Sequence, residues 1–223
     1  MWIDSDIIAH SGSQKYQKIW VPDKNYVVLG SSNKEETEVY REQCQADEVE
    51  ILRRCGGGGT VLLHRRCVIV SLGIWVKRLY QNDLYFKKIN DGILNVLKEM
   101  TPNRDSFNQK GFSDLVFKDR KFGGTSMFRS KRYLLYQASL LVDKDLALIE
   151  KYLQHPTKEP EYRKSRSHGD FLIGLNEIVP DLSTRQLVEV LQSNLEVSIE
   201  SQLSEEIGEV DQKHLMHLKK RIS

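Results

Sequence analysis

The chain has 223 residues, of which 39% are hydrophobic and 29% charged, the composition of an ordinary globular protein with one substantial core. Its 33 basic and 31 acidic residues give a formal net charge of +2, which argues against a large electrostatic surface for nucleic acid. The longest apolar stretch, 68–76, is interrupted by Ser71 and Gly73 and falls far short of the roughly 20 residues that a membrane-spanning helix needs.

The cysteines and the amino-terminal residues indicate the cellular compartment. Cys44, Cys55 and Cys67 are odd in number and follow no zinc-ligand spacing, so they suit neither a disulfide framework nor a metal site. Residues 1–12 include acidic side chains and no sustained apolar run, so they do not form a signal-peptide pattern. We therefore expect reduced thiols and a cytoplasmic protein.

The first third of the chain predicts short strands with one short helix between them. The sequence from Ile19 predicts a strand, a Pro-Asp turn and a second strand at Tyr26–Leu29. Asn33 and Glu36 have the spacing of a capping box, which predicts a helix over 35–45. Further β-prone runs predict strands at 49–54, 60–63 and 68–76.

The middle of the chain predicts one long helix and then a meander. We expect the helix over 84–100, with Asp83 as its cap. A stripe of apolar residues at helical spacing predicts its buried face: Tyr85, Ile89, Ile93, Val96 and Met100. Residues 101–111 are polar and rich in turn formers, which predicts a loop. Residues 112–143 predict three or four antiparallel strands joined by turns.

The last third is predicted to be mainly helical. A short helix near 145–152 precedes a basic loop over 158–171. Ser183 and Gln186 form a capping box that opens an amphipathic helix, with Leu187, Leu191 and Leu195 on its buried face. The charged tail over 200–223 is also predicted to be helical. Together the elements predict an α+β fold, in which helices pack on a mostly antiparallel sheet.

A run of glycines, Gly56 to Gly59, follows Arg53 and Arg54 and leads into β-branched residues. Glycine lets a ligand approach the backbone closely, so such a turn can present a concave row of N–H donors to an anion. The run is no P-loop, because no Lys-Ser or Lys-Thr pair follows it, and no dinucleotide fingerprint, because a strand comes next. A tight turn with solvated arginines is an equally good interpretation of this segment alone.

A second glycine pair, Gly123 and Gly124, lies two residues after Lys121, at a predicted turn between strands. An ammonium at this position can project into a groove lined by backbone amides. A lone surface lysine is usually inert. Two glycine-rich turns in one sheet, each with a cation beside it, instead favour a cleft that handles phosphate.

Four segments carry a family resemblance: "VVLGSSN", "RRCGGGGTV", "SDLVFKDRKFGGTS" and "EYRKSRSHGDFL". In order and spacing they resemble lipoate-protein ligase A and its relatives in the biotin and lipoyl ligase superfamily. The resemblance extends over 19–195, and the "KFGG" form looks most similar to a bacterial and plant subgroup of lipoate ligase-like proteins. It implies a class II synthetase-like, mostly antiparallel sheet flanked by helices.

The resemblance also implies a reaction and its participants. Such ligases join lipoate to ATP, with Mg²⁺, as lipoyl-adenylate, and then pass the acyl group to a lysine of a lipoyl domain. Acceptors would be the lipoyl domains of 2-oxoacid dehydrogenase E2 subunits or the glycine cleavage H protein. Lys121 would be the essential lysine. The residues that would line the acyl and adenylate site are Arg54, Gly57, Gly58, Gly59, Thr60, Asp114, Gly123 and Gly124.

The sequence departs from the family pattern at two places. Leu63 stands where the family has a histidine, and His64 is one residue out, on the opposite face of a strand. Gln137 and Ala138 stand where a later strand has His followed by Gly. The accessory carboxy-terminal domain of long ligases is also missing, so we expect a single catalytic domain over 1–223, with a separate accessory chain as a possible partner.

Other functions remain open at this stage. Related octanoyltransferases need a cysteine nucleophile, and no cysteine follows Cys67, so a thioester route would require Cys55 or Cys67 in an unusual position. A non-catalytic binder of a lipoylated domain or of a nucleotide would keep the same fold. The short basic segments predict solvated surface rather than nucleic-acid binding.

Two smaller features remain, of which the first is left undecided and the second is predicted to form no site. Arg166 and His168 lie either on an ordinary surface loop or beside the substrate pocket. His214 and His217 share one face of the predicted tail helix, but a third ligand is missing from the sequence around them, so no metal site is expected.

Overall fold

One large sheet forms the frame of the molecule. The computed structural model describes residues 3, 5–156 and 159–220. The strands of the sheet are β1 (Lys15–Trp20), β5 (Cys67–Trp75), β6 (Phe107–Lys110), β7 (Asp114–Phe117), β8 (Arg120–Ser130) and β9 (Tyr133–Leu141). They pair in the order β1-β5-β9-β8-β7-β6, and all neighbours are antiparallel. This sheet with its flanking helices confirms the predicted α+β class.

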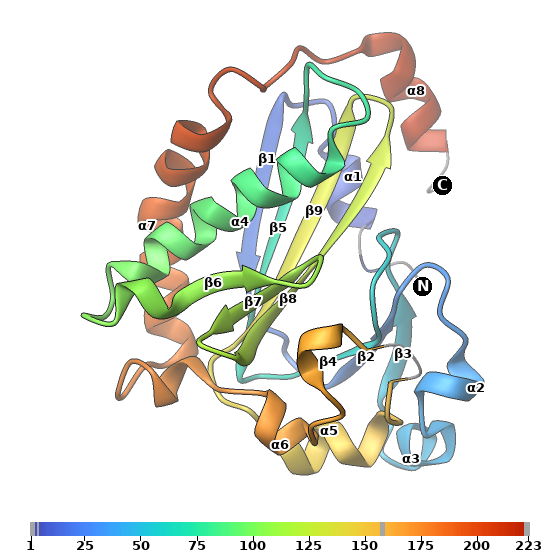
Figure 1. The fold of residues 1–223 in the computed structure, drawn as a ribbon. Coiled ribbons are helices and arrows are strands. Elements are labelled where there is room, and N and C mark those ends of the chain that lie inside the picture. The colour runs from blue at the N-terminus through green and yellow to red at the C-terminus, as the bar shows by residue number, and fades with distance from the viewer. Residues whose placement is uncertain (1–2, 4, 157–158, 221–223) are drawn as a thin grey trace.

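Two helices, α4 (Asn82–Lys98) and α7 (Thr184–Leu203), cover one face of the large sheet (Figure 1). The predicted stripe of α4 is buried except for Met100, which lies just past the helix and packs on the same core. The helices cross closely at Gly92, where a Cβ would come within 2.9 Å of Ile199 Cγ1. The core therefore lies between this helix pair and the sheet.

The amino-terminal cap predicted from the sequence is found at α7 but not at α4. At α7, Ser183 Oγ accepts a hydrogen bond from Gln186 N and Gln186 Oε1 accepts one from Ser183 N, which confirms the capping box. At α4 the predicted cap is wrong, because the helix begins at Asn82 and no described side chain caps it. Asp83 instead lies in the first turn, where its carboxylate faces the positive end of the helix dipole.

A second, three-stranded sheet packs at one end of the large one. It consists of β2 (Tyr26–Leu29), β3 (Glu50–Arg53) and β4 (Val61–Leu63), in the order β3-β2-β4. β2 is parallel to β3 and antiparallel to β4. Its apolar side packs against α3 (Arg41–Ala46) and α5 (Leu146–Tyr152), both visible at the lower end of the molecule in Figure 1. The strands and the helix near 145–152 lie where the sequence predicts them.

The helix predicted over 35–45 is interrupted. α2 (Glu35–Glu38) and α3 are separated at Val39, which pairs with Leu153 as an isolated β-bridge. The capping box predicted at its start is also wrong. Asn33 donates its side-chain amide to Thr60 Oγ1 instead, and Lys34 precedes α2 without a described side-chain cap. Tertiary partners thus take both residues away from the local helix signal.

The loop predicted over 101–111 contains a strand. A 3-10 turn (Arg104–Ser106) leads into β6, which adds an edge strand beside β7. Phe107 anchors it, with its ring against Phe117 and Phe122 at centroid distances of 5.1 and 5.5 Å. One buried aromatic residue and cross-strand pairing are enough here to order a polar segment. The meander of β7, β8 and β9 is as predicted, and β6 extends it.

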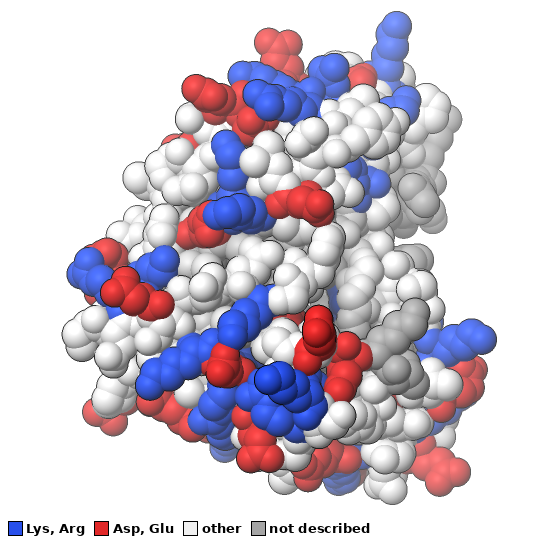
Figure 2. Space-filling model, viewed as in Figure 1, with Lys and Arg blue, Asp and Glu red and all other residues white. Residues whose placement is uncertain are grey.

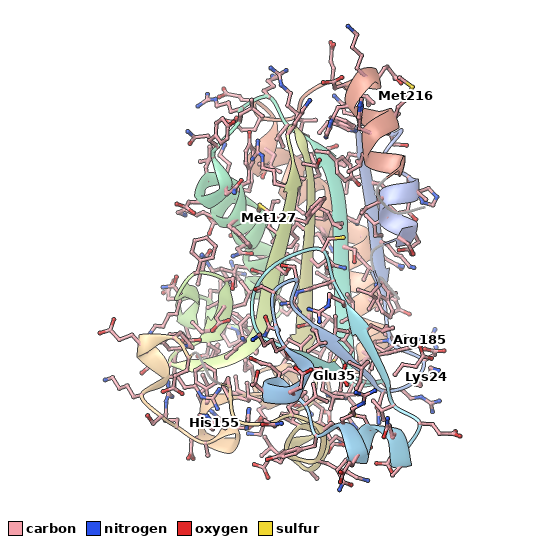
Figure 3. All side chains as sticks on the ribbon, turned by 90° about the vertical axis from the view of Figure 1, so that its right-hand side faces the viewer. Lys24, Glu35, Met127, His155, Arg185 and Met216 are labelled. Atoms are coloured by element: carbon pink, nitrogen blue, oxygen red, sulfur yellow. The ribbon has the colours of Figure 1, made fainter. Side chains whose placement is uncertain are left out.

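The carboxy-terminal tail is helical in part. After α7 ends at Leu203, α8 (Gln212–Lys220) packs near α1 (Ser5–Ala9). Met216 on α8 marks this end of the molecule in Figure 3, and Glu35 and His155 lie at the opposite end. His214 shares a hydrogen bond with Ser130 Oγ at 2.9 Å, whereas His217 is exposed. Residues 157–158 of the predicted basic loop and 221–223 of the predicted tail lie outside the described residues.

The surface carries mixed charge. Figure 2 shows basic and acidic side chains interspersed over the visible face. Within the described ranges, every helix is too short or too polar to cross a bilayer. The remaining short elements are 3-10 turns at Glu161–Arg163 and Leu175–Glu177 and the helix α6 (His168–Phe171).

Candidate active site

Two adjoining cavities lie between the large sheet and the small one. The first, cavity A, has a volume of about 120 Å³ and reaches toward Val28, Ile69 and Gln137. The second, cavity B, has a volume of about 300 Å³ and reaches toward Ile149 and Phe171. They share one wall, formed by Gly59, Thr60, Val61, Ser113, Asp114, Lys121, Gly124 and Ser139. A molecule with two unlike halves could therefore occupy both cavities and present its junction to this shared wall.

The first glycine turn, Gly56 to Gly59, forms part of the wall of cavity A through Gly58 and Gly59. Gly58 has a φ of 98°, a conformation that side-chain-bearing residues rarely adopt. Its carbonyl oxygen lies so near Gly30 that a Cβ there would come within 2.1 Å of it. A Cβ on Gly59 would meet nothing within 4 Å among the described residues, so its backbone faces the cavities openly. The glycines thus serve close packing on one side and ligand access on the other.

Arg54 is the internal brace of this turn. Its side chain is buried, and its Nη2 donates to Gly57 O and Gly59 O, both at 2.8 Å. Its Nε donates to Ser126 Oγ on β8 at 3.1 Å. The guanidinium lines cavity A, but these hydrogen bonds commit it to the loop carbonyls. The solvated arginine of the simpler sequence interpretation is therefore not found at this position.

The second glycine pair, Gly123 and Gly124, lies with Lys121 inside strand β8 and not at the predicted turn, because both glycines pair with β7 and β9 in the sheet. From this strand Lys121 reaches the shared wall. The register of β7 and β8 shifts between Leu115 and Val116, so that Phe122 is the extra residue of a β-bulge. The bulge sends the Phe122 ring into the core and leaves Lys121 beside the cavities. A Cβ on Gly124 would lie 3.2 Å from Lys121 Nζ, so the bare glycine makes room for the ammonium.

Asp114 joins Lys121 to a more distant segment. Its Oδ1 is 2.6 Å from Lys121 Nζ, and its Oδ2 accepts a hydrogen bond from the Tyr162 hydroxyl at 2.8 Å. Burial raises the pKa of Tyr162 well above its ordinary value, and the Asp114 carboxylate raises it further, so the phenol stays a donor. One carboxylate oxygen of Asp114 therefore faces a cationic donor, Lys121, and the other accepts from a neutral donor, Tyr162.

The segment around Tyr162 is attached to the strand that carries Lys121. Ile173 N donates to Lys121 O at 3.0 Å, and Arg120 Nη2 donates to Leu172 O at 2.6 Å. This attachment brings the 161–172 segment, more than thirty residues away in sequence, to the edge of cavity B. The geometry of the site thus depends on backbone pairing as well as on side chains.

Comparison with known families shows the family to which the chain belongs. A model described as the Lipoyl protein ligase A/B catalytic domain matches residues 4–196. The chain belongs to this family. The predicted resemblance to lipoate-protein ligase A is thereby confirmed.

Curated relatives include proteins with different stated activities. A probable lipoate-protein ligase A of Mycoplasma pneumoniae is 25% identical over 165 residues, 74% of this chain and 48% of that protein. A Plasmodium falciparum protein named inactive lipoate–protein ligase 2 is 26% identical over 181 residues, 67% of this chain and 47% of that protein. The chain spans about half the length of these curated relatives.

Solved structures share the fold. One is a chain of a bipartite lipoate protein ligase and its E2 lipoyl domain from Thermoplasma acidophilum. It matches with a TM-score of 0.73 and 16% identity, covering 98% of this chain and 84% of that one. A lipoate-protein ligase A bound with ATP matches with a TM-score of 0.71 and 17% identity, covering 98% and 86%. At these identities the likeness concerns the fold, and it confirms the architecture expected of a biotin and lipoate ligase.

The residues that the lipoyl-ligase resemblance assigned to the site lie mostly together. Lys121, Asp114, Gly59, Thr60 and Gly124 line both cavities. Arg54 and Gly58 line cavity A alone, and Gly123 lines cavity B alone. Gly57 is outside the described lining of both cavities, and its carbonyl instead accepts from Arg54.

The departures from the family pattern fall inside the site. Leu63, Gln137 and Ala138 all line cavity A. His64 lies outside the described lining of both cavities, and its Nδ1 accepts a hydrogen bond from Arg66 N at 3.3 Å. Burial lowers the pKa of His64, so the ring is held neutral. His64 therefore does not replace the histidine that the family has at position 63.

The cysteines do not line the site in the part of the chain that the structure describes. Cys44 and Cys67 are buried, and burial raises the pKa of the Cys67 thiol to about 12. Cys55 packs against an apolar cluster that includes Leu135 and Phe128. Among the described residues that line the two cavities, none is a cysteine. This arrangement speaks against a thiol nucleophile, because a reactive thiolate needs access and a depressed pKa.

Sequence reasoning missed Tyr162 and Arg163, both of which contribute to cavity B or its wall. Both lie within the "EYRKSRSHGDFL" segment that carries the resemblance, and that was the signal available. The structure gives different positions to Arg166 and His168, the two residues of this segment that the sequence left undecided. His168 lines cavity B, whereas Arg166 supports the segment from behind, with donors to Asp119 O and Tyr162 O.

Proposed function

We propose that the protein is an ATP-dependent lipoate-protein ligase. Cavity A would hold the acyl chain, cavity B the nucleoside, and the shared wall the reacting carboxylate and α-phosphate. One observation carries the proposal: the Lys121 ammonium lies over Gly124 on the wall common to both cavities, a wall to which the open backbone of Gly59 also belongs. An acyl-adenylate has its charged phosphate at just such a junction.

The cavity linings support this division. The apolar side chains of cavity A include Val28, Leu63 and Ile69, which suit a hydrocarbon chain. Cavity B is wider and has a cluster of apolar side chains that suits a flat base, formed by Leu62, Leu141, Ile149, Leu153, Phe171 and Leu172. Lys121 and Asp114 lie where the cavities meet.

The proposed reaction has two steps. First, a carboxylate oxygen of lipoate attacks the α-phosphorus of ATP, the bond to the β-phosphate breaks, and pyrophosphate leaves. Then the amine of an acceptor lysine forms an amide with the acyl carbon, AMP leaves, and the amine proton passes to solvent. In the first step negative charge grows on the α-phosphate oxygens, and Lys121 would stabilise it. One such placed donor contributes about 3 kcal/mol to lowering a barrier.

Asp114 would act on Lys121 and on magnesium. Its ion pair keeps the ammonium at the shared wall before a phosphate arrives. Mg²⁺ in nucleotide sites typically takes one or two carboxylates, with substrate phosphates and water as its other ligands. The Asp114 carboxylate fits that donor set because it lines both cavities. Bound magnesium would neutralise phosphate charge there.

The proposed acceptors are lipoyl domains, of E2 subunits of 2-oxoacid dehydrogenases or of the glycine cleavage H protein. We also propose that residues 1–223 act as a single catalytic domain that can work with a separate accessory chain. The bipartite ligase of Thermoplasma acidophilum supports this arrangement by its fold.

A catalytically impaired binder is the second candidate. Two points favour it: Leu63 and Gln137, where the family resemblance implies histidines, both line cavity A, and one relative is named an inactive ligase. Such a protein would bind a nucleotide or a lipoylated domain without transferring the acyl group.

The mass of an acceptor domain after reaction distinguishes the two candidates. The protein, lipoate and Mg²⁺ are incubated with a lipoyl domain in the presence and absence of ATP, and octanoate replaces lipoate in a parallel series. A ligase adds one acyl group only when ATP is present. An acceptor of unchanged mass with both acids would contradict ligase activity. A further reaction supplies an acyl thioester in place of the free acid and omits ATP, and acylation of the acceptor there would indicate a transferase.

A further inference from the structure

Arg163 has a buried donor without a partner. Its side chain is only 4% exposed, and its Nη2 is buried with no hydrogen-bond partner among the described residues. A buried donor that stays unpaired costs free energy, more when it is charged, so native structures rarely retain one without a use. Arg163 also lines cavity B. A small shift of the atoms that cover Nη2 would bring this unpaired donor to an occupant of the cavity.

The rest of the side chain is held firmly in place. Arg163 Nε donates to Arg166 O at 3.1 Å and lies 3.4 Å from Glu159 Oε2. The guanidinium carbon is 4.8 Å from the centre of the Phe171 ring, a stacked cation–π geometry. These contacts fix the plane of the guanidinium. Its unpaired corner is consequently preorganised for a ligand acceptor.

The donor lies in the part of cavity B that is separate from the reacting groups. Arg163 is absent from the described lining of cavity A, whereas Lys121 lines both cavities. Its neighbours in cavity B include Ile149, Leu153 and Phe171. Figure 1 shows α5 and α6 together beside β4 at this end, and Figure 3 shows His155, close in sequence, at the same end. The surroundings are apolar and suit a flat ring.

The local charge favours an uncharged acceptor over phosphate. Glu159 beside the guanidinium offsets its positive charge, and Glu38 also lines cavity B. The glycine turns and Lys121, which suit phosphate, belong to the shared wall instead. A second negative group near Glu159 would be repelled, whereas a lone pair on a ring nitrogen would not.

We propose that Arg163 Nη2 donates a hydrogen bond to a ring nitrogen of the purine base of the bound nucleotide. This inference rests on the proposed function, because it takes cavity B as the nucleoside site. Arg163 would then be a binding residue that fixes the base, while Lys121 acts on the phosphate. The unpaired donor of the ligand-free protein finds its partner when the nucleotide binds.

Arg166 supplies a matched control. Its guanidinium carbon lies 5.3 Å from the centre of the same Phe171 ring. Its donors are satisfied by backbone carbonyls, those of Arg163, Asp119 and Tyr162, and it is absent from the described lining of cavity B. A lysine at either position keeps the charge and removes the forked donor, so only the variant at 163 should affect the base.

Calorimetric titration with ATP and with pyrophosphate tests the proposal. Arg163→Lys is expected to weaken ATP binding about 10-fold, the effect of one lost hydrogen bond to a charged donor, and to leave pyrophosphate binding unchanged. Arg166→Lys should change neither by more than about 2-fold. Equal ATP affinity in Arg163→Lys and the wild-type protein would overturn the proposal, and so would a larger loss for pyrophosphate than for ATP.

The wild-type protein provides a test that needs no variant to fold. In 1-deaza-, 3-deaza- and 7-deaza-ATP one ring nitrogen is replaced by carbon, so one of the three should bind about 10-fold more weakly than ATP. Three affinities equal to that of ATP would overturn this inference alone. If the wild-type protein bound ATP no more tightly than pyrophosphate, that result would contradict the proposed function and this inference together.

Discussion

The two glycine segments look alike in sequence, since each has a cation beside it, but the first is a turn and the second lies within strand β8, and the structure uses the two cations differently. At the first turn, Arg54 is buried and donates to the loop's own carbonyls. At the second, Lys121 extends over Gly124 to the wall shared by the two cavities. The comparison teaches that a cation next to glycines either braces the turn or serves a ligand. Removing each one should therefore have a different consequence.

The difference has a geometric origin. Arg54 follows a short strand and turns back under the loop, where Ser126 and the carbonyls of Gly57 and Gly59 surround it. Lys121 precedes a β-bulge at Phe122, and the bulge leaves its side chain on the cavity side of the sheet. The planar guanidinium of arginine can donate to several carbonyl oxygens at once. The lysine ammonium is a compact charge on a flexible chain, which suits contact with a ligand.

The largest expected effect is that of Lys121→Ala on catalysis. We predict that transfer to an acceptor domain falls at least 100-fold, because the proposed charge on the α-phosphate loses its main cation. The side chain is partly exposed, so the unfolding temperature should stay close to the wild-type value. Acceptor mass and a thermal melt measure the two quantities. Near wild-type transfer in this variant would contradict the assigned role.

Arg54→Met should act on stability. Loss of the guanidinium leaves the carbonyls of Gly57 and Gly59 without their donor, and we expect the free energy of unfolding to fall by about 3 kcal/mol. Arg53→Met is the control, because Arg53 donates to Gly30 O and Asn33 O from a less buried position, and its loss should cost about 1 kcal/mol. Denaturation in urea measures both. Equal stabilities would show that Arg54 is not a brace.

Gly58→Ala and Gly57→Ala should differ within one turn. Alanine at 58 must take a φ of 98° with its Cβ 3.0 Å from Arg54 Nη2, which we expect to cost about 2 kcal/mol. At Gly57 a Cβ meets nothing within 4 Å among the described residues, so the change in stability should stay within about 0.5 kcal/mol. The same denaturation series compares them, and equal losses would contradict the described turn.

Gly124→Ala is predicted to have the smallest effect. The new methyl group would lie 3.2 Å from Lys121 Nζ, a distance at which the flexible ammonium must shift by a few tenths of an ångström. We expect about a 10-fold loss of transfer rate from this displacement, with an unchanged unfolding temperature. Kinetics of acceptor acylation give the first quantity. A fully active variant would mean that Lys121 does not need its present position.

Much of the fold was predictable because strong periodic signals determine it. The buried stripe of α4, the capping box of α7 and the apolar run of β5 all carry local patterns that agree with their tertiary roles. β6 was missed because one residue, Phe107, anchors an otherwise polar strand. The cap expected at Asn33 failed because its amide contacts Thr60 across the chain.

The candidate site was predictable in part. Glycines and Lys121 were found through motif spacing and family resemblance, and most of them line the cavities. The brace role of Arg54 depends on the loop folding back, which composition does not encode. Tyr162 and Arg163 reach the site only because the backbone near Leu172 pairs with the strand of Lys121. Such long-range pairing leaves no periodic trace in a single sequence.

The central claim is that Lys121 and the two glycine segments hold an acyl phosphate at the junction of the two cavities. Exchange of labelled pyrophosphate into ATP measures formation of that species directly, before any acceptor takes part. We predict exchange that requires both lipoate and Mg²⁺ in the wild-type protein and that is lost in Lys121→Ala. Exchange at the wild-type rate in Lys121→Ala, or equal exchange with and without lipoate, would contradict the claim.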